Sequence, residues 1–455
     1  MLMDKNVRIA IIGGGPAGLS AGMYLEQAGY DNYTIFERNG WVGGKCHSPE
    51  YNGRRYELGA IMGVPSYYAI KDVEDFCGIT HDGPRLNRNY KDIDGNVIDP
   101  FNPKKHPLKA PRLLQMKRQV KKFGELLQTK YKGYDVNGHR GVAQGRYDGY
   151  AVTPEREHIS GQNENLKDLA LPFKEFCEKN GVELVQDIWI GPFTSFGYGY
   201  FDEIPAAYVL KYLDFQTTMN FVKVNLWTWK DGTQSIWEHL NDKIKHPARL
   251  NSDITKVERK DGKVFITVNG EVEEFDKLIV TAPLQYFGEY ADIREDEKAH
   301  FDKIDYERYD VLGFLTEPDK APDISYYIME NMTPARLGHL MVYYHRWSDI
   351  GPDQMYVTYA LRKHRDLKEL PYEDVKQTVL KDLEIMGNPA KEVIQERDWY
   401  YFPHVFSEDY AAGWYDDVEA MQDKYDTFYA GEIMSFGDMD ETVEYSRELV
   451  ERFFK

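Results

Sequence analysis

The sequence VRIAIIGGGPAG at residues 7–18 decides the fold of this chain. Its first six residues form a mostly apolar run typical of a buried strand, and the small and apolar side chains that follow from Pro16 are typical of a buried helix. Between them, Gly13, Gly15 and Gly18 fit the G-x-G-x-x-G fingerprint of a dinucleotide-binding turn. Gly13 permits the tight turn, Gly15 lets the backbone approach a pyrophosphate, and Gly18 lets the helix pack closely on the strand. The helix N-terminus then offers free N–H groups to the phosphates.

A second strand and an acidic residue complete this opening unit. Residues 33–36 have the apolar character of a strand, and Glu37 follows them directly. A carboxylate at this distance from the glycines can accept the hydroxyl groups of a ribose, whereas a 2′-phosphate would call for a basic residue. The unit therefore predicts a Rossmann-like domain of the α/β class that binds a dinucleotide other than NADP.

The composition limits the partners of the chain. It has 455 residues and a formal net charge of −19, which repels nucleic acid and anionic membranes at long range. No apolar run approaches the roughly 18 residues of a membrane span, and the N-terminal residues have no secretory pattern. The widely spaced Cys46, Cys77 and Cys177 suggest neither a disulfide framework nor a metal site. We expect a cytoplasmic protein without a metal, in which a local basic group must receive any carboxylate of the substrate.

Several later segments have the pattern of single elements. Residues 111–128 predict a basic amphipathic helix whose charges suit a solvated outer face, and residues 138–165, rich in glycine and polar side chains, predict a surface loop. Residues 251–268 predict two strands around a turn at Asp261-Gly262. Further expected elements are buried strands at 277–281 and 427–430 and a helix at 440–454.

A second glycine cluster indicates which dinucleotide is bound. Gly43, Gly44 and Lys45 follow soon after Glu37, and the segment 429–438 combines a strand, a Gly-Glu pair and the start of a helix. With both segments, the chain resembles the flavin-containing amine oxidase superfamily, in which they contact FAD. The residues that the resemblance places at FAD are Gly13, Gly15, Ala17, Gly18, Glu37, Arg38, Gly44, Lys45, Gly431 and Glu432. Because no cysteine follows Cys177, the thioether attachment found in some members has no residue to use, and we expect FAD to bind non-covalently.

Longer strings make the resemblance narrower. The strings at 44–49, 59–66, 193–199, 205–215, 226–229, 341–347 and 399–405 resemble the bacterial polyunsaturated fatty acid isomerase family. The second of these strings adds Ala60, Ile61 and Met62 to the implied FAD contacts. Residues 140–165 are longer than we expect for that family, so the resemblance does not describe access to the pocket there.

The fold that the resemblance implies is a Rossmann-like FAD-binding domain with a helical cap and a mixed α+β substrate domain. The expected boundaries are 1–75, 230–284 and 422–455 for a discontinuous FAD-binding domain, 86–225 for the cap with a surface insertion near 138–165, and 285–421 for the substrate-binding domain.

The resemblance also implies a reaction. Members of the family convert linoleic acid to a conjugated diene with FAD and without net oxidation, by passing a hydride to flavin N5 and back. In this chain, Arg88 corresponds to the arginine that receives the substrate carboxylate, Phe221 to a gating phenylalanine, and Phe196 to an aromatic residue beside the reacting carbons, with Phe193 as a further pocket residue. A guanidinium offers a bidentate fork to a carboxylate, and an aromatic face can stabilise the cation that hydride loss leaves. The expected partner is therefore a long-chain polyunsaturated fatty acid.

Two other functions stay open from the sequence. A net oxidoreductase of the amine oxidase or desaturase type would bind the same FAD and consume oxygen or another acceptor. A flavin- or lipid-binding protein without turnover would bind its ligand and form no product.

If Arg88 does not receive the carboxylate, Arg336 and Arg346 are the next candidates. The natural fatty acid, the position and geometry of the product double bonds and the oligomeric state are not determined by these patterns.

Overall fold

The computed structural model describes residues 3–102, 104, 110–131, 164–317, 324–347 and 354–454. The predicted surface loop at 138–165 lies outside the described residues, apart from its last two positions, which begin a helix.

The N-terminal strand lies inside a four-stranded parallel sheet, as the glycine fingerprint predicts. The strand order is β16 (Thr427–Tyr429), β10 (Lys277–Val280), β1 (Ile9–Ile12) and β2 (Tyr33–Phe36). Nearly every residue of these strands is buried, because a parallel sheet is covered by other elements on both faces. Three separate parts of the chain therefore supply one sheet, and the predicted strands at 277–281 and 427–430 are confirmed.

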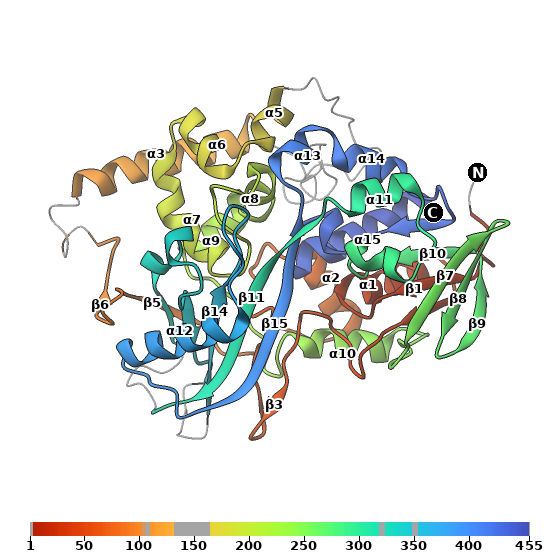
Figure 1. Cartoon of the computed structure of the whole chain (residues 1–455), viewed down its shortest axis with the longest axis horizontal. Helices are drawn as coiled ribbons and strands as arrows, with labels where there is room; N and C mark the ends of the chain where they lie inside the picture. The colour runs from red at the N-terminus through yellow and green to blue at the C-terminus, as the bar shows by residue number, and fades with distance from the viewer. Residues whose placement is uncertain are drawn as a thin grey trace.

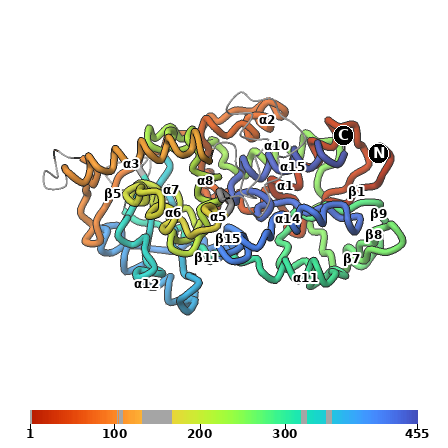
Figure 2. Tube along the Cα trace, turned by 90° about the horizontal axis from the view of Figure 1, so that it is seen from above, coloured from red at the N-terminus to blue at the C-terminus, as the bar shows by residue number. Residues whose placement is uncertain are grey.

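Helices cover this sheet at the end of the molecule where both chain termini lie (Figure 1 and Figure 2). The fingerprint helix α1 (Pro16–Gln27) packs on the C-terminal helix α15 (Met439–Phe453), and Ser446 Oγ donates to the carbonyl of Ala17 at 3.0 Å. Two more helices, α2 (Tyr68–Cys77) and α10 (Gln234–Lys243), pack against one another beside them. The predicted two-stranded segment forms a separate antiparallel sheet of β7 (Ile254–Lys260), β8 (Lys263–Val268) and β9 (Glu271–Phe275).

A second, seven-stranded sheet is mixed and makes the other half of the molecule. Its order is β15 (Glu392–His404), β11 (Asp305–Leu315), β14 (Met355–Leu361), β13 (Val342–Tyr344), β12 (Ile324–Tyr327), β5 (Asn87–Lys91) and β6 (Val97–Ile98). All neighbours are antiparallel except β5 and β12, which are parallel. The two sheets confirm the predicted fold class, a parallel dinucleotide-binding sheet joined to a mixed α+β part.

A layer of helices caps the second sheet at the top of Figure 1. Its members are α3 (Ala110–Gln128), α5 (Glu164–Ala170), α6 (Phe173–Asn180), α7 (Gln186–Thr194), α8 (Ala206–Tyr212) and α9 (Phe215–Val222). The predicted basic helix at 111–128 is α3. The assignment of the whole range 86–225 to this cap needs one correction, since β5 and β6 belong to the mixed sheet. The sequence of β5, NRNYK, has no apolar alternation, and its parallel partner lies far along the chain, so periodicity could not reveal the pairing.

Shorter elements complete the chain. The remaining helices and strands are β3 (Glu50–Tyr51), β4 (Arg54–Arg55), α11 (Glu295–Phe301), α12 (Tyr372–Ile385), α13 (Ser407–Ala411) and α14 (Trp414–Ala420), and the 3-10 turns are Glu183–Val185, Leu284–Glu289, Met329–Asn331, Pro334–Arg336 and Glu432–Met434. Among the helices of the described ranges, none is both long and apolar enough to cross a membrane.

Candidate functional site

A cavity of about 1210 Å³ lies where the strands of the parallel sheet end. Ile12 ends β1 and Gly13 follows it, Glu37 follows β2, Thr281 follows β10 and Gly431 follows β16, and all five line the cavity. Ligands of open α/β sheets bind at this carboxyl edge, where the strand order reverses. The cavity is larger than the roughly 300–1,000 Å³ of common ligand pockets. It therefore has room for a dinucleotide and a second ligand.

The fingerprint glycines meet three different constraints. Gly13 has a φ of +114°, and a side chain there would collide with Thr281 Oγ1. A β-carbon on Gly18 would lie 1.9 Å from the carbonyl oxygen of Gly13, so close helix–strand packing requires this glycine. A β-carbon on Gly15 would meet no protein atom closer than 3.6 Å, and its backbone is of the ordinary extended kind. No contact inside the protein requires a glycine at Gly15, which fits a cradle left open for a pyrophosphate.

Glu37 is held in place by the turn that it borders. Its Oε2 accepts the backbone N–H of Gly14 at 2.7 Å, and its Oε1 accepts the N–H of Asn39 at 2.7 Å. The side chain is buried yet lines the cavity. These bonds fix the carboxylate and leave lone pairs for the hydroxyls of a ribose.

The two superfamily segments face one another in the same cavity. Lys45 Nζ and Glu432 Oε2 form an ion pair at 2.5 Å, although the residues lie far apart in the sequence. Lys45 also lies 5.3 Å from the ring of Tyr401. The pair joins the segment after β2 to the segment after β16 across the cavity.

The structure brings together nearly all of the predicted cofactor residues. Those that line the cavity are Gly13, Gly15, Ala17, Glu37, Arg38, Gly44, Lys45, Ala60, Ile61, Met62, Gly431 and Glu432. Gly18 does not line the cavity; it lies where α1 packs against the backbone of Gly13. The set fits FAD in three respects: an open phosphate cradle, an acid for the ribose and an apolar stretch at Ala60 to Met62.

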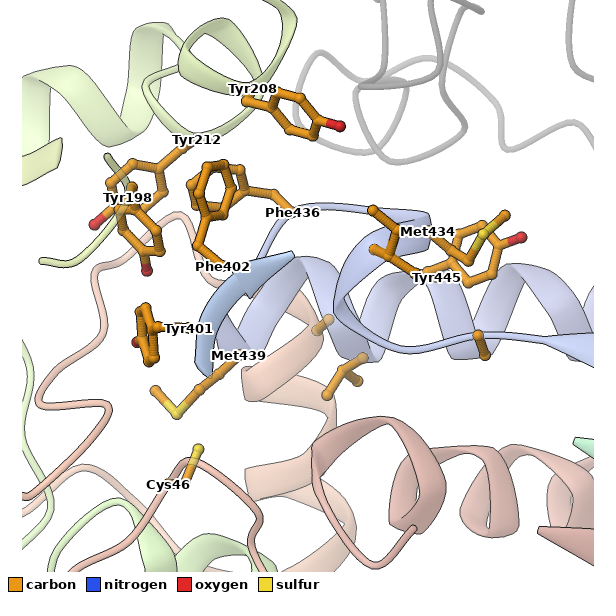
Figure 3. Close-up of a cluster of buried hydrophobic side chains, with 14 of the residues drawn as sticks. Cys46, Tyr198, Tyr208, Tyr212, Tyr401, Phe402, Met434, Phe436, Met439 and Tyr445 are labelled. Carbon is orange, nitrogen blue, oxygen red and sulfur yellow. The ribbon is translucent and has the colours of Figure 1, made fainter. Parts of the chain in front are cut away.

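Many aromatic side chains line the cavity together with the dinucleotide-binding residues. Among them are Phe196, Tyr198, Tyr212, Tyr306, Tyr309 and Tyr401. Figure 3 shows Tyr198 and Tyr212 gathered near Phe402 and Phe436, with Tyr401 and Met439 beyond them. Burial raises the pKa of Tyr198, Tyr212 and Tyr309 well above the ordinary value, so these phenols stay neutral. Of these six residues the sequence predicted only Phe196 at a site, and Tyr306, Tyr309 and Tyr401 are brought to the cavity by β11 and β15.

Two further groups of the cavity were also missed. Cys46 lines it, and burial raises the pKa of this thiol, so that it remains protonated. Asp438 caps the N-terminus of α15 by accepting the N–H of Glu441 at 2.8 Å, and it accepts the hydroxyl of Tyr67 at 3.2 Å. Burial raises the pKa of Asp438 to about 6. A protonated thiol suits an apolar site without a strong nucleophile, and the raised pKa makes Asp438 a weaker acid than an exposed aspartate.

One cation of the cavity stands among aromatic rings. Arg397 Nη2 donates to His47 Nε2 at 2.8 Å, and the imidazole stacks on Trp41 with ring centroids 4.2 Å apart. Burial, with the charge of Arg397, lowers the pKa of His47 to about 4. The neutral imidazole can therefore accept the bond, and Arg397 supplies the positive charge at this place.

The predicted substrate residues form a chain of contacts that leads away from the cavity. Phe196 lines the cavity, and its ring lies 6.1 Å from that of Phe221. The carbonyl of Phe221 accepts a bond of 3.0 Å from Arg88 Nη2. Neither Phe221 nor Arg88 lines the cavity itself. Phe193 does not line it either; its ring is fully buried in the core beside Phe402.

The turn after Phe196 depends on a glycine. Gly197 has a φ of +88°, and a β-carbon there would lie 2.9 Å from the rings of Tyr309 and Tyr401. Tyr309 also donates its hydroxyl to the carbonyl of Ser195 at 2.6 Å. The mixed sheet thus fixes the backbone on both sides of Phe196, and so the direction of its ring.

The two alternative arginines are already engaged. Arg346 is buried, pairs with the buried Glu57 and donates to the carbonyl of Trp229. Arg336 donates to Asn331 Oδ1 at 3.1 Å. None of the three arginines lines the cavity, but Arg88 is linked to it through Phe221 and Phe196. Within the described ranges, no group of three His, Cys, Asp or Glu side chains could hold a metal ion.

Comparisons with known proteins agree with this geometry. The family model described as flavin containing amine oxidoreductase matches residues 16–445. The crystal structure of the CLA-producing fatty acid isomerase from P. acnes is 51% identical, covers 100% of both chains and superposes with a TM-score of 0.89.

Two curated relatives match over shorter stretches. The polyenoic fatty acid isomerase of Ptilota filicina is 23% identical over 275 residues, which are 56% of this chain and 51% of that protein. The 4,4'-diapophytoene desaturase (4,4'-diaponeurosporene-forming) of Staphylococcus aureus is 24% identical over 291 residues, 61% of this chain and 55% of that protein. The matches thus span about half the length of these relatives. The family model and the full-length similarity to the P. acnes structure together show that the chain belongs to the flavin-containing amine oxidoreductase family.

Proposed function

We propose that the chain is an FAD-dependent isomerase that converts a polyunsaturated fatty acid of the linoleic acid kind to a conjugated diene without net oxidation. The observation that carries the proposal is that the dinucleotide-binding residues share one cavity with the aromatic side chains of Phe196, Tyr198, Tyr212 and Tyr309. Support comes from two relatives named as fatty acid isomerases, one of them similar over the whole chain.

The chemistry divides between cofactor and protein. When bound, FAD supplies a position that accepts a hydride and gives it back, so that no external oxidant is needed. The protein must hold the bis-allylic carbon at that position, exclude water, and stabilise the positive charge that spreads over five carbons of the substrate. Neutral aromatic faces attract a cation without trapping it covalently. The raised pKa values of Tyr198, Tyr212 and Tyr309 keep these residues from ionising and adding to the cation.

Arg88, which we propose binds the carboxylate of the substrate, does not line the cavity itself. Arg88 uses one guanidinium nitrogen for the carbonyl of Phe221, and among the described residues its other donors have no partner and could bind a carboxylate. The contact with Phe221 joins this arginine to the proposed gate, whose ring faces Phe196. Binding of the carboxylate at Arg88 would then position the chain end while the double bonds reach Phe196.

Linoleate deuterated at the bis-allylic carbon tests the proposed route directly. Because the hydride that leaves is the one that returns, the label should be retained in the conjugated product, at a terminal carbon of the former pentadienyl unit. A parallel reaction in heavy water should introduce little deuterium, and no oxygen should be consumed. Loss of the substrate label with extensive solvent label would refute the hydride route, because it would indicate proton exchange through a base.

A second candidate function is net oxidation. It is favoured by the similarity to the Staphylococcus aureus desaturase and by the family to which the chain belongs. The same assay separates the two: stoichiometric peroxide, or dependence on an added acceptor, would indicate an oxidoreductase. Bound fatty acid with no new diene absorbance would indicate a lipid-binding protein without turnover.

A further inference from the structure

Helix α3 has a basic outer face that the proposed reaction does not use. Its apolar side packs on the cap through Leu113, Met116 and Phe123, which are buried. The opposite side carries a row of exposed cations, which we call the basic stripe: Lys117, Arg118, Lys121 and Lys122. Residues at these spacings share one face of a helix. The stripe therefore points away from the protein.

The stripe is a local reversal of charge. The protein as a whole has a net charge of −19, yet α3 carries five cations and one carboxylate. Among the ion pairs of the described residues, Lys121 is the one stripe residue with a partner, Glu125 at 3.8 Å, and both side chains are highly exposed. Such a pair contributes little and is screened by solvent. The charge of the stripe is thus free to attract an external polyanion.

Exposed apolar side chains accompany the cations. Leu114 lies on the same outer side of α3 and is 53% exposed. Val222, at the end of α9, is 48% exposed and precedes the exposed Lys223. An apolar side chain among cations matches a surface whose anionic groups lie over an apolar interior, as in a lipid bilayer.

The stripe lies one helix away from the proposed receiver of the substrate carboxylate. Helices α3 and α9 are in contact, and Gly124 of α3 faces the ring of Phe215. Helix α9 carries Phe221, whose carbonyl binds Arg88. Both helices belong to the cap, on the side away from the chain termini in Figure 1.

We propose that the basic stripe docks the protein on an anionic lipid surface, from which the polyunsaturated acid reaches Arg88 and the cavity. The transfer of substrate rests on the proposed function, whereas the docking itself does not. Lipid is favoured over an acidic protein because Leu114 adds an exposed apolar side chain beside the cations of α3. Nucleic acid is disfavoured because its phosphate backbone offers no apolar partner for the exposed Leu114 beside the cations.

The test is co-sedimentation of the FAD-loaded full chain with vesicles. The vesicles consist of phosphatidylcholine alone or of phosphatidylcholine mixed with phosphatidylglycerol. Binding is expected only to the mixed vesicles, and it should weaken as added salt shortens the Debye length. The variant K117E/R118E/K121E/K122E should partition onto these vesicles roughly tenfold or more weakly.

A matched variant separates the stripe from net charge. K230E/K260E/K368E/K381E makes the same change of charge at exposed lysines of other elements, and it should bind as well as the unchanged protein. Equal loss in both variants, or no binding of the unchanged protein, would overturn the proposal. The proposal would also be overturned if an acidic protein bound through the basic stripe while lipid binding did not depend on the stripe. The melting temperature of each variant verifies that it is folded. Vesicle binding is measured without substrate turnover, so a failure of the docking proposal can be distinguished from a failure of the proposed reaction.

Discussion

Gly15 and Gly18 lie in the same turn, yet an added methyl group would meet different surroundings at each. At Gly15 the nearest protein atom would be 3.6 Å away, and at Gly18 it would be 1.9 Å away. We predict that Gly15→Val abolishes FAD binding while the cofactor-free protein keeps its melting temperature, because the side chain fills the space of the pyrophosphate. Gly18→Ala should instead destabilise the cofactor-free protein by about 1–3 kcal/mol, as is typical of overpacking.

The measurements are flavin absorbance per chain and thermal unfolding of the cofactor-free protein. The result that would contradict the interpretation is normal flavin content in Gly15→Val. An equal loss of stability in both variants would indicate that Gly15 also serves packing.

Arg88 carries the second residue-scale prediction. Arg88→Ala should weaken the binding of free fatty acids more than that of their methyl esters, because only the acid offers a carboxylate to the guanidinium. A charge-assisted bond is worth about 1.5–3 kcal/mol, or roughly one to two decades in affinity. Titration of acid and ester against both proteins measures the difference. Equal losses would remove Arg88 from this role and leave only the contact with Phe221.

At the scale of single elements, helix α15 has a titratable cap. Burial raises the pKa of Asp438 to about 6, above the ordinary value of 3.8. A carboxyl whose pKa is higher in the folded state stabilises that state at low pH, and this stability is lost as pH rises from about 4 through 6. Asp438→Asn keeps a capping oxygen but does not ionise. Relative to this variant, the cofactor-free protein should lose of the order of 3 kcal/mol of unfolding free energy between pH 4 and pH 7.

Chemical denaturation of both proteins across that pH range measures the effect. Parallel curves, with a constant difference between Asp438→Asn and the unchanged protein, would show that the carboxyl does not titrate in this range.

Elements differ in how far the sequence predicts them. The strands β1, β2, β10 and β16 are short apolar runs buried on both faces, so local pattern suffices to find them. The strand β5 is polar and joins the mixed sheet through its parallel neighbour β12, a pairing that no local pattern reveals. The same holds for the site. Glycines and an acid predict a phosphate cradle, whereas Tyr306 and Tyr309 of β11 reach the cavity only through the packing of the mixed sheet.

At the scale of the whole molecule, the mode of cofactor attachment can be tested. The protein should be yellow, and acid or heat should release intact FAD. The absence of a cysteine after Cys177 supports this expectation, and the cavity contains Cys46 as a protonated thiol, which is a poor nucleophile. Cys46→Ser should therefore keep a full complement of releasable FAD. Flavin that remains on the denatured chain, and is lost in Cys46→Ser, would show a covalent bond at this residue.

The parallel sheet draws its strands from three distant parts of the chain, and this has a consequence for synthesis. A nascent chain has made β1, its glycine turn and β2 early, but β10 only at residue 280 and β16 only at residue 429. The lining of the cavity is completed only when Gly431 and Glu432 have been synthesised. Capture of the cofactor must therefore wait until residues 427–432 have been synthesised, and a ribosome stalled before residue 427 would hold a chain whose dinucleotide site is open on one side.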